Sequence, residues 1–211
     1  MKRTYNSKQK TRWLVSVAMF AAIIVLLAFT PLGLIPVSFI KATTIQIPVV
    51  IGAVLLGPLA GAVLGGVFGI CSMVNATIAP TPMSFAFSPA MAMNGAGAVK
   101  AVWIALGCRI LIGVVAGWLW RAFKKVKLPD IPALAITGAA GAMTNTALVM
   151  GSIYVLLAKE YAQSIGKSVG AVFKIIMSVV AVNGIPEAIV TAIIVMIVGK
   201  ALLAMRKRST R

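Results

Sequence analysis

Apolar residues form long, nearly unbroken runs along this chain, and charged residues gather at the ends of those runs. A run of about 20 apolar residues matches the roughly 30 Å hydrocarbon core of a bilayer, which accepts apolar side chains on every face of a helix. The pattern predicts an all-α, polytopic membrane protein with six transmembrane helices. The expected spans are residues 13–29, 42–56, 59–75, 99–120, 131–157 and about 170–205.

The composition agrees with a membrane location. Hydrophobic residues make up 61% of the chain and charged residues 11%, and the mean hydropathy is +1.04, outside the range of soluble globular proteins. The formal net charge of +17 comes from lysines and arginines that cluster before the first run, after the fourth and at the carboxyl end. Such clusters mark cytoplasmic segments, whereas a nucleic-acid-binding protein would spread its charge along one face. We expect a basic cytoplasmic arm at residues 1–12, a six-helix transmembrane domain at 13–205, a basic cytoplasmic tail at 206–211, and no nucleic-acid partner.

Two outer connections, residues 30–41 and 76–98, are too apolar to be ordinary solvent-exposed loops. Both contain prolines and glycines that stop a helix, together with Leu, Ile, Met and Phe side chains that are costly to expose to water. We expect both to fold back over the bundle, where the first could close a cavity. The remaining outer connection, residues 159–170, is polar and is expected to be an external loop.

Glycines recur every fourth residue at Gly57, Gly61, Gly65 and Gly69. Gly57 and Pro58 predict a tight turn that joins the second and third spans into a helical hairpin. The repeat also places a glycine groove on one face of the third span, which lets a neighbouring backbone approach closely. Packing within the chain is favoured over a contact between two copies.

The residues needed for common enzyme chemistry are missing. The chain contains no histidine and no Gly-x-x-x-x-Gly-Lys-Ser/Thr phosphate loop, so His-based catalysis and ATP hydrolysis lack their usual groups. Of the three acidic residues only Glu187 lies inside a span, which leaves no carboxylate pair for acid–base chemistry. Cys71 and Cys108 lie within apolar runs and are expected to be buried hydrophobic residues. No catalytic residue, metal site or cofactor is expected.

Several polar side chains nevertheless fall inside or at the ends of the predicted spans, where burial is costly and each is a candidate for function. Helical rise places Arg109 and Glu187 near mid-depth. They either neutralise each other as an interhelical pair or contact a ligand, and the sequence leaves both open. The segment 183–187, Asn-Gly-Ile-Pro-Glu, also predicts a kink or an unwound turn in the sixth span. The candidate substrate-binding residues are Lys41, Lys100, Arg109, Asn145, Lys174, Asn183 and Glu187.

The charges among these candidates do not balance. A pair between Arg109 and Glu187 would leave Lys41, Lys100 and Lys174 near the outer mouth without acidic partners in the membrane. A cavity at that mouth would prefer an anion. The alternative for each of these lysines is that it extends its ammonium group to the membrane interface.

Several features together resemble the substrate-binding S components of energy-coupling factor (ECF) vitamin transporters. They are the basic amino-terminal arm, Ala18 and Ala22 in the first span, and the segments LIPVSFIK at 34–41, IPVVIGA at 47–53, LGPLAG at 56–61 and NGIPE at 183–187. Within that family the chain is most similar to the pantothenate branch. It lacks the acidic motif of the riboflavin branch, because residues 42–48 read Ala-Thr-Thr-Ile-Gln-Ile-Pro.

The resemblance implies a multi-pass subunit in the plasma membrane of a prokaryote that captures a water-soluble vitamin, most simply the anion pantothenate. Riboflavin, pyridoxine, hydroxymethylpyrimidine and folate are the alternatives. It further implies a transmembrane coupling subunit (EcfT-like) that grips the Ala18 and Ala22 face, two cytoplasmic ATPases (EcfA-like), and delivery by toppling in the bilayer. On this view the first three helices, including the glycine repeat, form a docking and sliding surface, and the last three form the binding half.

Two other functions remain as alternatives. An autonomous secondary carrier or channel would be favoured by an inverted repeat, but the second span is short and the sixth is long, so the two halves do not match. An intramembrane enzyme would need a nucleophile and a base, and the serines of the chain have no histidine to activate them.

Overall fold

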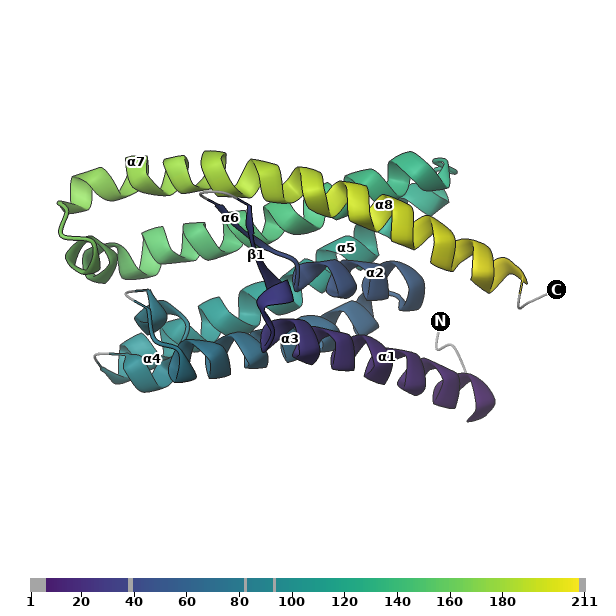
Figure 1. Cartoon of the computed structure of the whole chain (residues 1–211), viewed down its shortest axis with the longest axis horizontal. Helices are drawn as coiled ribbons and strands as arrows, with labels where there is room; N and C mark the ends of the chain where they lie inside the picture. Colours follow the sequence, from purple (N-terminus) through teal and green to yellow (C-terminus); the bar gives the residue numbers. More distant parts are fainter. Residues whose placement is uncertain (1–6, 38–39, 82, 93, 209–211) are drawn as a thin grey trace.

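The computed structural model describes residues 7–37, 40–81, 83–92 and 94–208, with the backbone alone described at 32, 34–37, 40–42 and 207–208. Its long helices run roughly parallel, and both ends of the chain lie at the same end of the bundle (Figure 1). We call this the cytoplasmic end, because the basic clusters lie there, and the opposite one the outer end. The helices are α1 (Ser7–Ala28), α2 (Gln46–Leu56), α3 (Pro58–Ile78), α4 (Gly95–Val102), α5 (Cys108–Lys125), α6 (Asp130–Ser164), α7 (Val169–Val179) and α8 (Ile185–Arg208).

The prediction of an all-α, polytopic membrane protein is confirmed, with five long helices and one short one in place of six full spans. Two π-helical turns, η4 (Trp103–Gly107) and η5 (Val180–Gly184), join α4 to α5 and α7 to α8 into continuous helices. In the part of the chain that the structure describes, five helices are long and apolar enough to cross a membrane: α1, α3, the α4–α5 helix, α6 and the α7–α8 helix. The sixth element, α2, has 11 residues, about 16 Å of rise, which is half the thickness of the hydrocarbon core.

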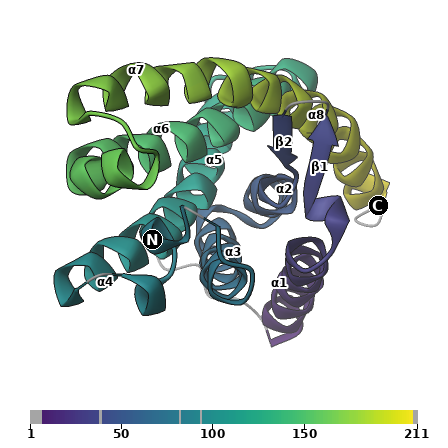
Figure 2. The same ribbon diagram turned by 60° about the vertical axis from the view of Figure 1, so that its left-hand side comes forward.

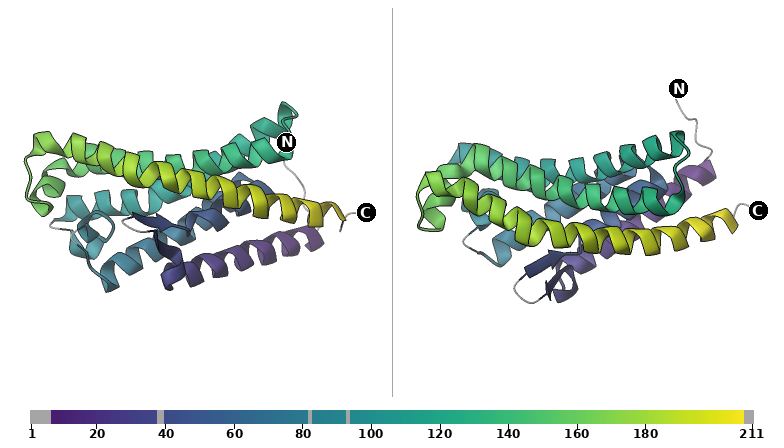
Figure 3. Two further views of the ribbon diagram at one scale, coloured as in Figure 1. Left: turned by 45° about the horizontal axis from the view of Figure 1, so that its top comes forward. Right: turned by 90° about the horizontal axis from the view of Figure 1, so that it is seen from above.

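The short helix α2 occupies the centre of the bundle. It is surrounded by α1, α3, α5, α6 and α8 (Figure 2). Every residue from Gln46 to Val54 is buried, so α2 has no face left for lipid. Along one side, α6 and the α7–α8 helix run next to each other over the length of the bundle (Figure 3).

The first outer connection folds back against the bundle, as predicted, but it does so as a β-hairpin that the sequence analysis did not predict. Strands β1 (Leu34–Val37) and β2 (Ile40–Thr43) pair antiparallel, with Leu34 opposite Thr43 and Val37 opposite Ile40. The β-branched residues in both segments favour extended backbone. Strand β2 contacts η5 and α8, which places the hairpin across the outer end of α2.

The second outer connection is also folded in. It forms two short 3₁₀ turns, η2 (Ser84–Ala86) and η3 (Pro89–Met91), and Ala86 and Ser88 are fully buried. The Ser88 and Thr77 hydroxyl groups share a hydrogen bond of 2.7 Å, which ties the connection to the end of α3. Asn94 then caps α4 by accepting a hydrogen bond from the Gly97 amide at 2.7 Å.

The prediction of an external loop at 159–170 is wrong over much of that range. Helix α6 continues through Ser164 with a kink at Leu157, and the turn to α7 takes residues 165–168. Tyr161 and Ala162 are buried in a cluster with Val172 and Ile176, so packing extends the helix beyond the apolar run. The predicted interruption at 183–187 is present as the π-turn η5 rather than as an unwound segment.

The glycine repeat packs α3 against α5, so the preference for packing within the chain is confirmed. A Cβ atom on Gly61 would lie 2.4 Å from the Gly113 carbonyl oxygen, and one on Gly65 would lie 2.2 Å from the Arg109 carbonyl oxygen. Real Cβ atoms do not approach so closely, and the two backbones are therefore in direct contact. The expectation that this repeat belongs to an exposed sliding surface is wrong, because these glycines face the interior.

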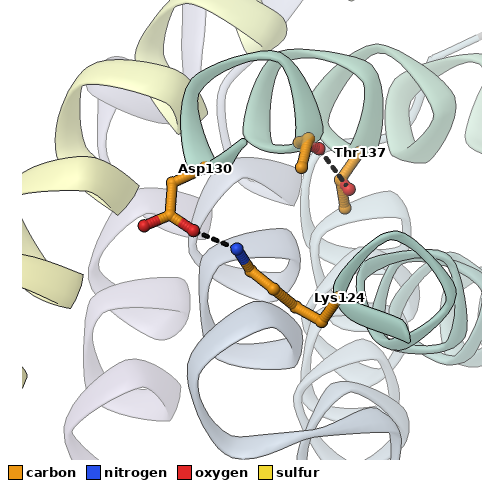
Figure 4. A network of polar contacts seen from close by, with 4 residues as sticks. Lys124, Asp130 and Thr137 are labelled. Atoms are coloured by element: carbon orange, nitrogen blue, oxygen red, sulfur yellow. Dashed lines mark hydrogen bonds and ion pairs between the residues drawn. The ribbon is translucent and has the colours of Figure 1, made fainter. Parts of the chain in front are cut away.

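The cytoplasmic end is closed by charged residues that hold the helix ends. Lys124 and Asp130 form an ion pair across the turn between α5 and α6 (Figure 4). The Arg206 Nη1 atom donates to the Leu55 carbonyl at 2.5 Å, near the carboxyl end of α2. A cation at this position satisfies a free carbonyl and opposes the helix dipole.

Candidate functional site

Three central helices meet at an apolar level inside the bundle. A Cβ atom on Gly141 of α6 would lie 2.6 Å from the Val50 Cγ2 atom of α2 and 3.9 Å from the Ile112 Cγ2 atom of α5. Val50 and Ile112 are fully buried. The three helices are therefore in contact at this depth, and we call this apolar level the floor of the outer half.

One helical turn outward from this floor, each of the three helices carries a polar side chain. Gln46 precedes Val50 by four residues, Arg109 precedes Ile112 by three, and Asn145 follows Gly141 by four. Helices α2 and α5 run toward the cytoplasmic end and α6 runs away from it, so each of these steps leads outward along one helix face. We call Gln46, Arg109 and Asn145 the polar ring.

Each member of the polar ring has a buried atom without a hydrogen-bond partner. These atoms are the Gln46 Oε1, the Arg109 Nε and the Asn145 Oδ1. An unpaired buried polar group typically costs about 1–3 kcal/mol, so folded proteins rarely keep several at one level. The ring offers one positively charged donor and two acceptors toward the protein interior.

Arg109 is held by its own helix and by two aromatic rings. Its side chain is 7% exposed, and its Nη1 atom donates to the Ile104 carbonyl at 2.6 Å. The π-turn η4 makes that carbonyl accessible, since the Cys108 amide bonds Trp103 instead of Ile104. The guanidinium carbon also lies 5.0 Å from the ring centroid of Phe87 and 5.4 Å from that of Phe68. These contacts fix a buried cation while leaving its Nε atom unused.

Glu187 does not form an ion pair with Arg109, which was one of the two alternatives that the sequence left open. Its Oε1 atom instead accepts a hydrogen bond of 2.8 Å from the Gln46 Nε2 atom, which also donates to the Thr191 Oγ1 atom at 3.2 Å. Gln46, Glu187 and Thr191 are 0%, 8% and 1% exposed. Arg109 and Glu187 lie within electrostatic range of each other but out of contact, because each has found other partners.

Asn183 lies on the π-turn η5, next to the polar ring. A Cβ atom on Gly184 would lie 2.9 Å from Thr146 Cγ2, so η5 packs on α6 beside Asn145. In a helix, the Ala181 carbonyl would accept a hydrogen bond from the amide of residue 185 or 186. The Ile185 amide donates to the Val180 carbonyl instead, and Pro186 has no N–H. Asn183 is half-buried on this turn, and the Ala181 carbonyl has no helical donor.

None of the three candidate lysines is placed at the polar ring: Lys100 and Lys174 lie elsewhere, and the Lys41 side chain is not described. The Lys100 Nζ atom donates to the Leu156 carbonyl at 2.8 Å, beside the kink at Leu157. Lys174 lies on the exposed face of α7. Lys41 belongs to β2, and its side chain lies outside the described residues.

A separate groove of about 310 Å³ lies further toward the outer end, between η4 and α6. None of the polar ring residues lines it, and its wall is apolar except for Ser152. Val155 at its rim is 77% exposed, so the groove opens on the outer surface of the bundle. The groove is lined by Trp103, Ala147, Leu148, Gly151, Ser152, Val155 and Leu156.

The proposed docking residues lie on an uncovered face. Ala18 and Ala22 are both exposed, one turn apart on α1. Only 17% of the apolar window of α1 is buried within the chain, and its neighbours are α2, α3 and η1. The small side chains therefore form a shallow strip on an otherwise bulky apolar face.

Gln46 is the functional candidate that the sequence analysis missed. It is the polar residue at the start of the apolar segment 45–56, and that isolation was a usable signal. The sequence analysis treated residues 42–56 as a short span and did not single out Gln46. The β-hairpin instead covers the start of α2, so Gln46 lies at the level of Arg109.

Comparison with known proteins identifies the family. A family model described as "ECF transporter, substrate-specific component" matches residues 12–199. The chain is 33% identical over 172 residues to the pantothenic acid transporter PanT of Lactococcus lactis subsp. cremoris, covering 81% of this chain and 82% of the relative. It is 27% identical over 210 residues to the pantothenate transporter PanT of Leuconostoc mesenteroides, covering 96% and 98%.

These matches and the five long apolar helices agree on a multi-pass protein of the cell membrane. The family predicted from the sequence motifs is confirmed. This chain belongs to the substrate-specific components of ECF transporters.

Proposed function

We propose that this chain binds pantothenate with high affinity from the outer side and delivers it across the membrane when docked on an energising module. The polar ring is the observation that carries the proposal. It offers one cationic donor, Arg109 Nε, and two acceptors, Gln46 Oε1 and Asn145 Oδ1. Pantothenate presents a carboxylate, an amide and two hydroxyl groups, and the names of both relatives point to the same compound.

Arg109 is the proposed partner of the carboxylate. Among the cationic candidates whose side chains the structure describes, it is the one that lies at the ring and has an unused N–H. Charge-assisted hydrogen bonds to a buried anion are worth about 1.5–3 kcal/mol each. Asn145 and Asn183 supply amide groups for the neutral part of the ligand.

The chain depends on other subunits for energy, as its family assignment implies. We propose that a transmembrane coupling subunit (EcfT-like) grips the Ala18 and Ala22 face and that two ATPases (EcfA-like) drive the cycle. The exposed, small-residue strip on α1 supports this arrangement. The same strip is compatible with toppling of the loaded subunit against its partner.

Calorimetry on purified protein tests the binding step. Pantothenate should bind without ATP, and Arg109→Ala should weaken binding at least tenfold, the equivalent of about 1.4 kcal/mol. Asn183→Ala should weaken it less. Heat with riboflavin, pyridoxine, hydroxymethylpyrimidine or folate but none with pantothenate would reassign the vitamin.

Proteoliposomes test the division of labour. Vesicles that contain this chain alone should bind pantothenate but not accumulate it. Addition of the coupling subunit, both ATPases and ATP should start accumulation. Uptake by the chain alone would identify an autonomous carrier instead.

A further inference from the structure

Gln46 is a fully buried amide that uses one end and not the other. Its Nε2 atom donates to Glu187 at 2.8 Å and to Thr191 at 3.2 Å. Its Oε1 atom has no partner, although Gln46 is 0% exposed. A buried amide oxygen at the level of two other unpaired groups is an acceptor that lacks its donor.

Glu187 determines which end of the Gln46 amide is left for a ligand. The Gln46 Nε2 atom donates to the Glu187 Oε1 atom and to the Thr191 Oγ1 atom, so the NH₂ group of the amide is turned toward α8. The carbonyl oxygen then faces away from α8.

Arg109 is the positively charged member of the polar ring, and its position gives an elongated anion a direction. A ligand carboxylate is attracted to the Arg109 guanidinium group, whereas Glu187 is an acceptor already bonded to Gln46 and offers an anion no attraction. The anionic end therefore binds at Arg109. The neutral end, where pantothenate carries its hydroxyl groups, is directed toward Gln46.

We propose that the Gln46 Oε1 atom accepts a hydrogen bond from a hydroxyl group of the bound ligand, with Glu187 as the positioning residue that orients the amide. This inference rests on the proposed function and adds a hydroxyl subsite to it. A site built to bond a hydroxyl group discriminates strongly against a ligand that lacks it, because the buried acceptor is then left unpaired.

A pair of ligands tests the subsite on the unaltered protein. The probes are pantothenate and N-(3,3-dimethylbutanoyl)-β-alanine, which has the same carboxylate and amide but neither hydroxyl group. Competition binding should favour pantothenate by about tenfold or more. Equal affinity for the two probes would overturn the inference, and no binding of pantothenate would overturn the proposed function itself.

Variants assign the discrimination to Gln46. Gln46→Met keeps the length of the side chain and removes its oxygen, so pantothenate should lose about tenfold in affinity while the analogue loses little. Gln46→Asn, which keeps the amide but withdraws the oxygen, should give the same selective loss if Gln46→Met does not fold. An equal loss for both probes would show a structural role only.

Glu187→Gln tests the positioning role. The variant lets the Gln46 amide turn either way, so the preference for pantothenate over the analogue should fall even though Gln46 is intact. An unchanged preference would overturn this role. Thr137→Val is the matched control, because the Thr137 hydroxyl is fully buried but already donates to the Ala133 carbonyl at 2.7 Å (Figure 4). It should leave both affinities unchanged.

Discussion

The cytoplasmic and outer halves of the bundle are built in different ways. In the cytoplasmic half, Gly61 and Gly113 bring the backbones of α3 and α5 into contact, and the helix ends are held by paired charges. In the outer half, the helices contain two π-turns and a kink, and three polar atoms at one level have no partner. The close contact of α3 continues outward to Gly65 and Gly69, so the two halves differ in their broken helices and unpaired polar atoms and not in this contact.

Helix α5 belongs to both halves, which explains how they are joined. Arg109 and Gly113 are one turn apart on it, and the backbone of Arg109 rests on Gly65 of α3. The glycine contact is thus the support that keeps the guanidinium group at its depth. A functional side chain is positioned more accurately on a rigid element than on a loop.

The largest expected effect comes from breaking the glycine contact. A Cβ atom in Gly113→Ala would lie 2.0 Å from the Gly61 carbonyl oxygen, so α3 and α5 must separate. Overpacking of this kind costs about 1–3 kcal/mol. We expect a lower melting temperature in detergent and, because Arg109 moves with α5, weaker pantothenate binding.

Gly151→Ala is the matched control for that substitution. Nothing lies within 4 Å of a Cβ atom at Gly151, which is also in a long helix. Helix propensity favours alanine by up to about 1 kcal/mol, so its melting temperature should stay the same or rise. Equal destabilisation by both substitutions would show that the close contact between α3 and α5 does not account for the loss of stability.

The second-largest effect is expected from a change on the exposed face of α1, and it should alter transport but not ligand binding. Ala18→Trp places a bulky side chain on the exposed strip of α1 without disturbing the interior. Uptake into proteoliposomes with the complete transporter should be lost, while pantothenate affinity of the isolated chain stays the same. Ile197→Trp, at a position of α8 that is 60% exposed, should leave uptake unchanged. Loss of uptake in both variants would remove the assignment of α1 as the docking face.

The sequence predicted the crossing elements well because membrane insertion depends on the local run of apolar residues. It also found Arg109 and Glu187, because a charge inside such a run is conspicuous. It could not predict their partners, since contacts between helices depend on how each helix is rotated and how deeply it is placed. Gln46 illustrates the difficulty: its role depends on the β-hairpin that covers the start of α2, and strand pairing depends on contacts that hydropathy does not describe.

The smallest effect separates two lysines that the sequence treats alike. Lys100 donates to the Leu156 carbonyl beside the kink of α6, whereas Lys174 lies on the exposed face of α7. Lys100→Met should therefore lower stability by about 1 kcal/mol, the usual net value of one hydrogen bond, and Lys174→Met should change it little. Thermal unfolding measures the stability of the two variants, and calorimetry measures their affinity for pantothenate.

If Lys174→Met weakens binding more than Lys100→Met does, a lysine on the exposed face of α7 attracts the anion to the outer mouth. Arg109 is then not the main source of the selectivity of the protein for anions. If neither variant changes the affinity, the charge selectivity lies below the mouth, where Arg109 is held by a carbonyl group and two aromatic rings.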